Sequence, residues 1–222
     1  MPGDSEIAGI VRDASASGTR LRIVGRGTWL DAGHPVIADA RLSLHDDSGI
    51  VSWVPGDLTV TARAGTTLRE LNDALASHDQ WVALDPASDG DATLGAIAAT
   101  CSYGPAAALF GTPRDQVLGL TVVTGRGDIV HAGGRVVKNV AGFDLTRLMI
   151  GAWGTLGVIT EITLRVRSRA VRKDSMVHMR RDLPASHGFC EPQLTEPALS
   201  AALMQRFDPS VIFNPGIMRA AG

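Results

Sequence analysis

The chain of 222 residues lacks the features that mark several protein classes. It has two cysteines, Cys101 and Cys190, too few for a disulfide framework and in no C-x-x-C pattern, so both are expected to be reduced and structural. No stretch approaches about 18 uninterrupted apolar residues, and the N-terminus has neither a charged n-region nor a long apolar h-region. These absences predict a cytoplasmic protein without a transmembrane segment.

Charge and aromatic content are low as well. The formal net charge is −2 and aromatic residues make up 5% of the chain, so no overall field attracts nucleic acid and no basic and aromatic interleaving suggests base stacking. The histidines are scattered without metal-ligand spacing. Neither a G-x-G-x-x-G after a strand, nor a P-loop motif, nor a G-x-S-x-G occurs. Nucleic-acid binding, a metal site, and Rossmann, P-loop or serine-hydrolase chemistry are therefore not expected.

Hydrophobic residues are plentiful, at 45% of the chain, which suffices for one substantial core or a core with a small lobe. The clearest pattern lies between residues 145 and 167. Apolar residues at helical spacing predict a short helix there: Leu145, Leu148, Met149 and Ala152. Alternation with a period of two predicts a strand over 158–167. Between them stand three glycines that allow positive φ and close approach of a flat or anionic ligand: Gly151, Gly154 and Gly157.

The remaining chain alternates between helical and strand patterns. We expect helices over 5–16 and 67–78, and strands over 21–24, 36–38, 49–54, 58–64, 116–123 and 128–131. Thr67 and Glu70 have the spacing of a capping box. The turn from Gly25 to Trp29 could form a nest of backbone N–H groups for a pyrophosphate, with an ordinary strand-to-loop turn as the alternative. Residues 168–198 are basic and predict a solvated linker rather than an anionic docking patch.

The run at residues 138–161, KNVAGFDLTRLMIGAWGTLGVITE, resembles the FAD-binding subunit of bacterial glycolate oxidase and related D-2-hydroxyacid dehydrogenases. These proteins belong to the vanillyl-alcohol oxidase and p-cresol methylhydroxylase (PCMH-type) flavoproteins. The resemblance extends to GRGT at 25–28, AGTTLREL at 64–71, and the tail with FDP at 207–209 and NPG at 214–216.

This resemblance implies an α+β fold, a PCMH-type FAD-binding domain of two α/β lobes over residues 1–55 and 56–167, with FAD between them and the lobe boundary near Pro55-Gly56. Relatives carry a cap, or substrate, domain of roughly 150 residues that builds one wall of the active site. Here about 35 residues separate the long strand from the FDP tail, so most or all of the cap is missing. The expected domains are 1–167 for FAD binding, 168–198 as a basic linker and 199–222 as a tail packing back on the FAD domain.

The resemblance also implies a cofactor site. Thr28 stands where covalent members of the family have a histidine, so a noncovalent FAD is expected. For Arg114 and Asp115 a local turn ion pair is the alternative to a cofactor role. The expected cofactor-binding residues are Gly25, Arg26, Gly27, Thr28, Trp29, Pro86, Thr93, Leu94, Gly95, Ile97, Ala98, Arg114, Asp115, Lys138, Gly151, Gly154, Thr155, Gly157, Val158 and Ile159. No catalytic residue can be named from the sequence.

The function implied is that of a bacterial flavoprotein subunit that oxidises a 2-hydroxyacid of the glycolate or D-lactate type to the 2-oxoacid. Its implied partners are a homologous FAD-linked catalytic subunit and an iron–sulfur subunit, which could hold it peripherally at the inner membrane face. Two alternatives stay open because the cap is missing. The chain could be a noncatalytic FAD-binding or structural partner subunit, or a degenerate remnant without turnover of its own.

Overall fold

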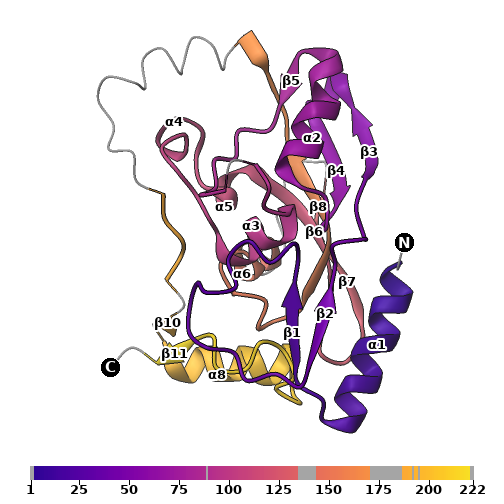
Figure 1. Cartoon of the computed structure of the whole chain (residues 1–222), viewed down its shortest axis with the longest axis vertical. Helices are drawn as coiled ribbons and strands as arrows, with labels where there is room; N and C mark the ends of the chain where they lie inside the picture. Colours follow the sequence, from indigo (N-terminus) through magenta and orange to yellow (C-terminus); the bar gives the residue numbers. More distant parts are fainter. Residues whose placement is uncertain are drawn as a thin grey trace.

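A five-stranded antiparallel sheet forms the centre of the molecule (Figure 1). The computed structural model describes residues 3–88, 90–134, 144–170, 187–191, 193–194 and 196–220. The strand order is β3-β4-β8-β6-β7, and every neighbouring pair runs antiparallel. The strands are β3 (Ile50–Val54), β4 (Thr59–Arg63), β6 (Val117–Val123), β7 (Ile129–Gly133) and β8 (Val158–Arg165).

Strand β8 lies in the middle of this sheet, between β4 and β6. Six of its eight residues are buried, and because successive residues point to opposite faces, both faces of the strand are covered. Helix α3 (Leu94–Thr100) packs against β8. The strand predicted from alternation over residues 158–167 is thus confirmed as far as Arg165, whereas Arg167 begins the separate strand β9 (Arg167–Ser168).

A smaller parallel sheet joins segments from opposite ends of the chain. Strand β1 (Leu21–Val24) pairs with β2 (Ala40–Ser43), with Leu21 opposite Ala40. On its other edge, Leu21 forms a parallel bridge with Phe213. The Leu21 N–H donates to the Ile212 carbonyl at 2.6 Å, and the Asn214 N–H donates to the Leu21 carbonyl at 2.9 Å. The C-terminal tail therefore acts as a third strand beside β1.

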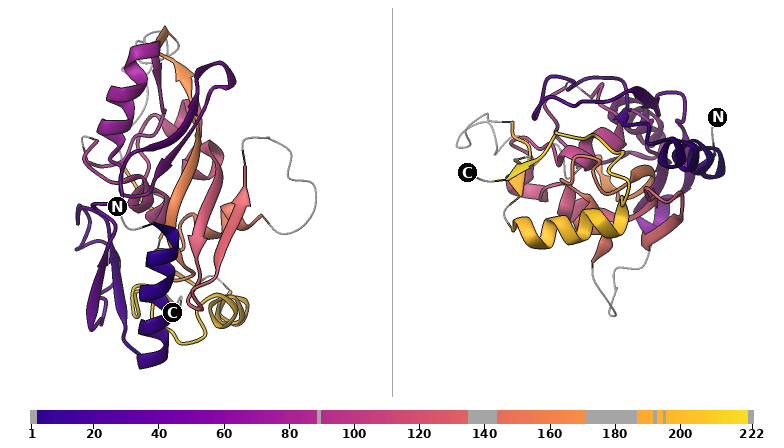
Figure 2. Two further views of the ribbon diagram at one scale, coloured as in Figure 1. Left: turned by 90° about the vertical axis from the view of Figure 1, so that its right-hand side faces the viewer. Right: turned by 90° about the horizontal axis from the view of Figure 1, so that it is seen from below.

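Two long helices lie near this small sheet. Helix α1 (Asp4–Ser17) buries Ile7 and Val11 and packs against β6 and β7. Helix α8 (Pro197–Phe207) lies at the same end of the molecule as β1 and β2 (Figures 1 and 2). Asp208 follows α8, and its buried carboxylate accepts the N–H groups of Ile212 at 3.2 Å and Phe213 at 2.9 Å. Burial raises the pKa of this carboxyl above its ordinary range, and the two hydrogen bonds fix the turn that leads the tail to β1.

Helix α2 (Leu68–Leu75) has the predicted capping box, which is confirmed. The Glu70 N–H donates to Thr67 Oγ1 at 3.1 Å, and the Thr67 N–H donates to Glu70 Oε2 at 2.8 Å. This second hydrogen bond holds the pKa of the Glu70 carboxyl below its usual value. The helix buries its predicted apolar stripe and continues as η2 (Ala76–His78).

Short elements complete the fold. They are η1 (Pro55–Asp57), β5 (Gln80–Trp81), α4 (Ala107–Phe110), α5 (Pro113–Gln116), α6 (Leu145–Met149), β9 (Arg167–Ser168), β10 (Gln193–Leu194) and β11 (Arg219–Ala220). β5 pairs with β9, and β10 pairs with β11. None of the helices in the described ranges is long and apolar enough to cross a membrane.

Two expectations about local structure differ from the fold. Residues 36–38 form no strand, because they lie in a surface loop in which the Ile37 N–H donates to the Pro215 carbonyl and the Ile37 side chain is 64% exposed. The strand that pairs in parallel with β1 is β2, which begins at Ala40, two residues after the predicted strand ends. Strand β3 pairs with β4, so the chain passes from the small sheet to the large one between Ser43 and Ile50, earlier than Pro55-Gly56.

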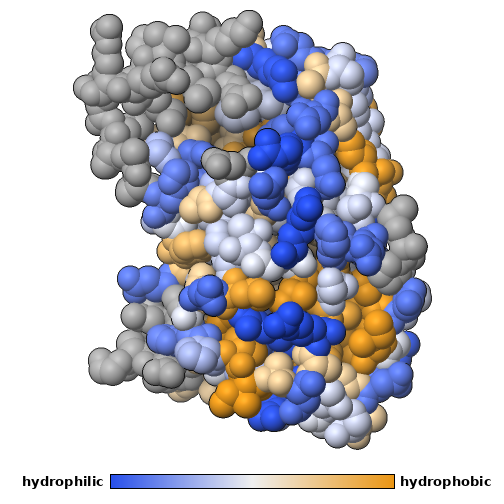
Figure 3. All heavy atoms as spheres, in the orientation of Figure 1, coloured by the Kyte–Doolittle hydropathy of each residue, from blue (hydrophilic) through white to orange (hydrophobic). Residues whose placement is uncertain are grey.

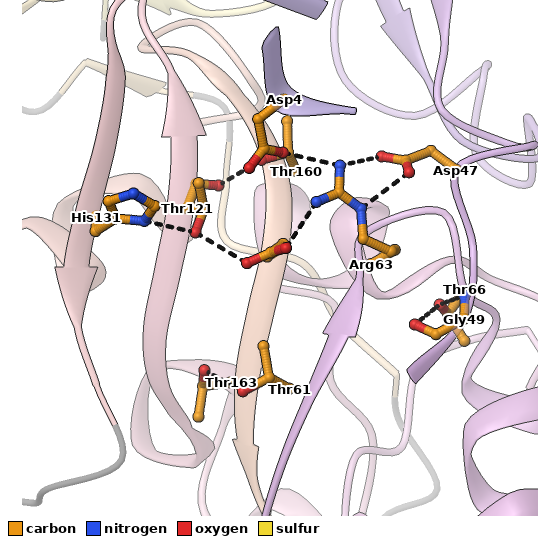
Figure 4. A network of polar contacts seen from close by, with 11 residues as sticks. Asp4, Asp47, Gly49, Thr61, Arg63, Thr66, Thr121, His131, Thr160 and Thr163 are labelled. Carbon is orange, nitrogen blue, oxygen red and sulfur yellow. Dashed lines mark hydrogen bonds and ion pairs between the residues drawn. The ribbon is translucent and has the colours of Figure 1, made fainter. Parts of the chain in front are cut away.

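A buried ionic cluster around Arg63 on β4 joins distant parts of the chain (Figure 4). The guanidinium donates twice to Asp47, at 2.9 and 2.6 Å, and once to Glu161 on β8, at 2.7 Å. It also pairs with Asp4 at the start of α1, at 2.8 Å. Burial by itself lowers the pKa of Arg63, but the hydrogen bonds to Asp47, Asp4 and Glu161 outweigh burial and hold it above its usual range. The cluster ties the N-terminus and the loop after β2 to the large sheet.

Candidate functional site

The main candidate site is a partly open cavity beside β1, with about 800 Å³ of empty space that includes open solvent. On the face drawn in Figure 3, apolar residues gather in the half of the molecule that contains β1 and the tail in Figure 1. The cavity is lined by Arg22, Ile23, Val24, Gly25, Gly27, Thr28, Trp29, Leu30, Leu44, Ala64, Thr93, Gly95, Ala96, Ala99, Thr100, Trp153, Gly154, Gly157, Ile159, Asn214 and Ile217. Four segments thus form its walls: the end of β1, α3, the glycine loop before β8, and the tail.

The loop after β1 supplies backbone donors to this cavity. Gly25 lies so close to α3 that a Cβ there would be 2.1 Å from Thr93 Oγ1, and Gly27 has a φ of +81°. In the described part of the chain, no protein acceptor pairs with the backbone N–H groups of residues 26–29. Successive backbone N–H groups in a loop next to a cavity are suited to phosphate oxygens.

Helix α3 turns one stripe of small residues toward the cavity. Thr93 caps the helix by accepting the Ala96 N–H at 3.3 Å. Gly95, Ala96, Ala99 and Thr100 line the cavity, while Leu94, Ile97, Ala98 and Cys101, spaced i, i+3, i+4 and i+7, are buried in the core. This helix was not predicted from the sequence.

The glycine loop contributes a wall organised around Trp153. Gly151 and Gly154 have positive φ values of 81° and 70°, as predicted. At Gly157 the reason for glycine is space, because a Cβ there would lie 2.4 Å from Val122 Cγ1. Trp153 itself has a φ of 54°. Its N–H donates to the Ala99 carbonyl on α3 at 2.8 Å, and its indole donates to the Cys190 carbonyl at 2.9 Å. These bonds hold a bulky residue in the left-handed region beside the cavity.

Asn214 of the tail connects two of these walls. Its Oδ1 accepts the Ile23 N–H of β1 at 2.8 Å, and its Nδ2 donates to the Trp153 carbonyl at 2.8 Å. Gly154 leaves the necessary space, since a Cβ there would lie 2.7 Å from Asn214 Nδ2. A single buried side chain thus fixes β1 relative to the glycine loop.

Nine of the expected site residues line this cavity together. They are Gly25, Gly27, Thr28, Trp29, Thr93, Gly95, Gly154, Gly157 and Ile159. They come from three segments that are far apart in the sequence.

The other expected site residues lie elsewhere. Leu94, Ile97, Ala98 and Val158 are buried in the core. Arg26 is exposed, and Pro86 is buried without lining the cavity. Arg114, Gly151 and Thr155 line a second cavity. Lys138 is outside the described residues.

Arg114 and Asp115 each have a separate partner. The Asp115 carboxylate accepts the Thr112 N–H at 2.9 Å and completes a capping box on α5. Arg114 Nη2 donates to the Ile150 carbonyl at 3.2 Å. The described chain therefore has no ion pair between these two neighbours.

The lining of the main cavity is nearly uncharged. Arg22 is the only ionisable side chain among the described lining residues, and it donates to the Leu30 carbonyl. No carboxylate or histidine lines the cavity in the described ranges, so this part of the chain offers no general base there. Nor does the described part contain a cluster of three or more potential metal ligands. The arrangement is suited to binding rather than to proton transfer.

Sequence reasoning missed several lining residues, among them Arg22, Ala96, Ala99, Trp153 and Asn214. For Ala96 and Ala99 a signal existed, since they lie opposite the apolar stripe of α3 once that segment is read as a helix. Asn214 belongs to the NPG motif of the tail, but nothing local indicates that its side chain reaches β1.

Comparisons with known proteins agree with this arrangement. The family model described as "FAD binding domain" matches residues 3–133. Glycolate oxidase subunit GlcE of Escherichia coli is 41% identical over 160 residues, which cover 72% of this chain and 45% of that protein. Glycolate oxidase subunit GlcD of Bacillus subtilis is 34% identical over 130 residues, covering 59% and 28%. The mitochondrial D-lactate dehydrogenase [cytochrome] of Arabidopsis thaliana is 45% identical over 111 residues, covering 50% and 19%.

Solved structures agree on the fold. An alkyldihydroxyacetonephosphate synthase matches with a TM-score of 0.65 and 24% identity, over 76% of this chain and 33% of that one. In each of these comparisons the matched region spans less than half of the relative's length.

Proposed function

Because this chain belongs to the FAD binding domain family of the PCMH-type flavoproteins, we propose that it holds FAD noncovalently in the cavity beside β1. The observation that carries the proposal is the loop at residues 26–29, whose backbone N–H groups have no acceptor in the described part of the chain and lie next to two glycines at the cavity wall. These donors fit the pyrophosphate of FAD. Thr28 has no nitrogen to attach to the flavin, which favours a dissociable cofactor.

The residues present fit a flat, anionic cofactor. Glycines and alanines of α3 and the glycine loop leave room for rings to approach the backbone, and Arg22 adds one positive charge to the lining. FAD would supply hydride and electron-transfer chemistry when bound. The protein's own part is to orient the cofactor and to exclude water with Trp29, Trp153 and Ile159.

The reaction we propose is the oxidation of a 2-hydroxyacid of the glycolate or D-lactate type to its 2-oxoacid. Its support is that relatives are named as glycolate oxidase subunits and D-lactate dehydrogenases. The partners we propose are a homologous FAD-linked catalytic subunit and an iron–sulfur subunit, at the cytoplasmic side of the inner membrane. The domain division we propose keeps residues 1–167 as the FAD-binding domain, 168–198 as a linker and 199–222 as the tail.

A second candidate function is that of a noncatalytic subunit, which binds FAD but turns over no substrate by itself. The nearly uncharged lining favours it, because no described carboxylate or histidine in the cavity could take the substrate's proton. The two candidates differ in one measurement. A flavin that bleaches when D-lactate or glycolate is added to the isolated protein supports the first, and bleaching only after a homologous catalytic subunit is added supports the second.

We expect the purified chain to show flavin absorption bands near ~375 and ~450 nm. These bands should survive desalting and leave the protein on denaturation, because the proposed contacts are hydrogen bonds and packing rather than a covalent bond. The measurement is the visible spectrum before and after addition of FAD. If no flavin binds even with excess FAD, the proposal is wrong. If the bands stay with the denatured chain, the noncovalent part is wrong.

Substituting Asn214 by alanine should weaken flavin binding about tenfold and lower the free energy of unfolding by about 2–3 kcal/mol, because the Ile23 N–H and the Trp153 carbonyl would lose their buried partner. Flavin fluorescence titration and urea unfolding measure the two effects. The matched control is Asn72→Ala, which removes the acceptor of the Val82 N–H at 2.8 Å, and neither of these residues lines the cavity. That variant should lose stability without losing flavin affinity. Equal losses of affinity in both variants would argue against a specific role of Asn214.

A further inference from the structure

A second cavity lies beside the glycine loop, and the proposed function does not use it. It has a volume of about 910 Å³, is open to solvent, and is lined in part by Arg114, Gly151, Cys190 and Met204. Cys190 is partly exposed in its wall, whereas Cys101 is fully buried behind it. Both are free thiols.

The backbone brings the two cysteines together. Cys101 ends α3 in the left-handed conformation, with a φ of 50°. The Cys190 N–H donates to the carbonyl of the preceding residue, Thr100, at 3.1 Å. The two thiols also influence each other, since each is the largest cause of the other's pKa shift. The two residues are 89 positions apart in the sequence, so no C-x-x-C spacing reveals their contact.

Gly151 and Arg114 complete the surroundings of Cys190. A Cβ on Gly151 would lie 3.3 Å from Cys190 Sγ and 3.1 Å from Arg114 Nη2, so the sulfur and the guanidinium flank the same point of the backbone. Arg114 is held there by its bond to the Ile150 carbonyl. The neighbouring Cys101 thiol, together with the charge of Arg114, lowers the pKa of Cys190 to about 6 against the effect of burial. The same contact, together with burial, raises the pKa of Cys101 above its usual range.

This environment differs from that of a structural cysteine. A thiolate is the reactive form of cysteine, and reactive cysteines lie in partly exposed, electropositive surroundings, whereas buried thiols in apolar surroundings are inert. Cys190 has the first environment and Cys101 the second. The open cavity gives a small oxidant access to Cys190.

We propose that Cys190 and Cys101 form a reversible dithiol–disulfide pair that reacts with hydroperoxides, with Cys190 as the attacking thiol and Cys101 as the resolving thiol. The Cys190 sulfur attacks a peroxide oxygen, so that an S–O bond forms, the O–O bond breaks and water or an alcohol leaves. The Cys101 sulfur then attacks the sulfenic acid, an S–S bond forms, and a second water leaves. Two thiols are oxidised for each peroxide reduced, and an external dithiol reverses the change.

The disulfide would fasten residues 187–191 to the end of α3. This segment already contacts the wall of the main cavity, because the Phe189 ring packs edge-on against Trp29 at a centroid distance of 5.3 Å and lies 6.0 Å from Trp153. The Gly188 N–H and carbonyl also bond to Tyr103, at 2.8 and 2.9 Å. A disulfide with an S–S length of about 2.05 Å would hold this segment in place covalently until the disulfide is reduced.

The test exposes the reduced full chain to one equivalent of hydrogen peroxide. We expect loss of both free thiols, a mass decrease of about 2 Da without reduction, and a peptide linking residues 101 and 190 that dithiothreitol separates. In Cys101→Ser, dimedone should trap a sulfenic acid on Cys190. In Cys190→Ser, the buried Cys101 should react at least about tenfold more slowly. The experiment needs no bound flavin and is repeated with and without FAD, so its outcome is independent of the proposed function.

A matched pair of arginine variants tests the electrostatic part. Arg114→Gln should slow the oxidation of Cys190 by about tenfold, whereas Arg126→Gln, which removes an exposed arginine far from Cys190, should not. Circular dichroism checks that each variant is folded. The proposal is overturned if both thiols survive excess peroxide in the folded protein, if disulfides form only between chains, or if Cys101→Ser and Cys190→Ser react at the same rate.

Discussion

Gly25→Ala is expected to lower the affinity for FAD by about 100-fold or more. A Cβ at this position would lie 2.1 Å from Thr93 Oγ1, a distance that relaxed structures essentially never contain, and 3.0 Å from its Cγ2, which is a tight contact. Either the Thr93 side chain must rotate and give up its hydrogen bond from the Ala96 N–H, or the loop after β1 or the start of α3 must move by about 1 Å, and a displacement of that size at a binding site can cost about 100-fold. The added strain should also lower the free energy of unfolding by about 1–3 kcal/mol. Flavin fluorescence titration and urea unfolding give the two numbers.

Two further variants give this prediction its controls. Gly9→Ala places a methyl group on α1 where no heavy atom lies within 4 Å, and it should leave flavin binding unchanged while stabilising the helix by about 0.5–1 kcal/mol. Thr93→Ala in the Gly25→Ala background removes the two clashing atoms and should restore part of the lost affinity. Full flavin affinity in Gly25→Ala alone would mean that the approach of β1 to α3 is not required for the site.

Arg63→Met is expected to lower the free energy of unfolding by about 3–5 kcal/mol. The substitution keeps much of the side-chain volume but leaves the carboxylates of Asp47, Asp4 and Glu161 without their shared cation. Asp47 is only 1% exposed, so water cannot replace the lost partner. Removing one member of a buried ionic cluster costs much more than the cluster contributes as a whole, because an uncompensated charge remains inside. Urea unfolding followed by circular dichroism measures the change.

The control for this substitution is Arg20→Met. Arg20 also forms a close pair with a carboxylate, Asp39, at 2.6 Å, but both side chains are more than 40% exposed. Exposed pairs contribute little because water screens them, so this variant should unfold at nearly the same urea concentration as the wild type. If Arg63→Met and Arg20→Met lower the free energy of unfolding equally, burial does not explain the contribution of the Arg63 cluster to stability.

Local sequence patterns predicted those helices and strands whose determining contacts lie within the element itself. The alternation over 158–167 predicted β8, and the Thr67–Glu70 spacing predicted the capping box of α2, because in each case the determining contacts lie within a few residues. The family resemblance predicted the FAD-binding fold, which the matches to the family model and to solved structures confirm. The positive φ of Gly151 and Gly154 followed from residue type alone.

The sequence could not indicate contacts that only the tertiary fold creates. Asn214 bonds to Ile23 and Trp153, and the Cys190 N–H bonds to Thr100 beside Cys101, without any periodicity that connects these positions. Arg63 gathers carboxylates from α1, a loop and β8, and each of these residues alone resembles an ordinary surface charge. In α3 the choice of Ile97 and Ala98 as site residues rested on the motif, whereas the helical period turns them to the core.

The third strand of the small sheet also constrains when the molecule can fold. The Ile23 N–H and its acceptor, Asn214, are 191 residues apart, so β1 lacks one of its two neighbours until residue 214 has left the ribosome. Contacts at such sequence separation form late, since their loop-closure entropy must be overcome first. The large sheet, whose last strand ends at Arg165, is synthesised well before that point. During translation the chain should therefore populate a partly folded intermediate in which one edge of β1 has no partner. In this state, chaperone binding or incorrect strand pairing would compete with completion of the cavity.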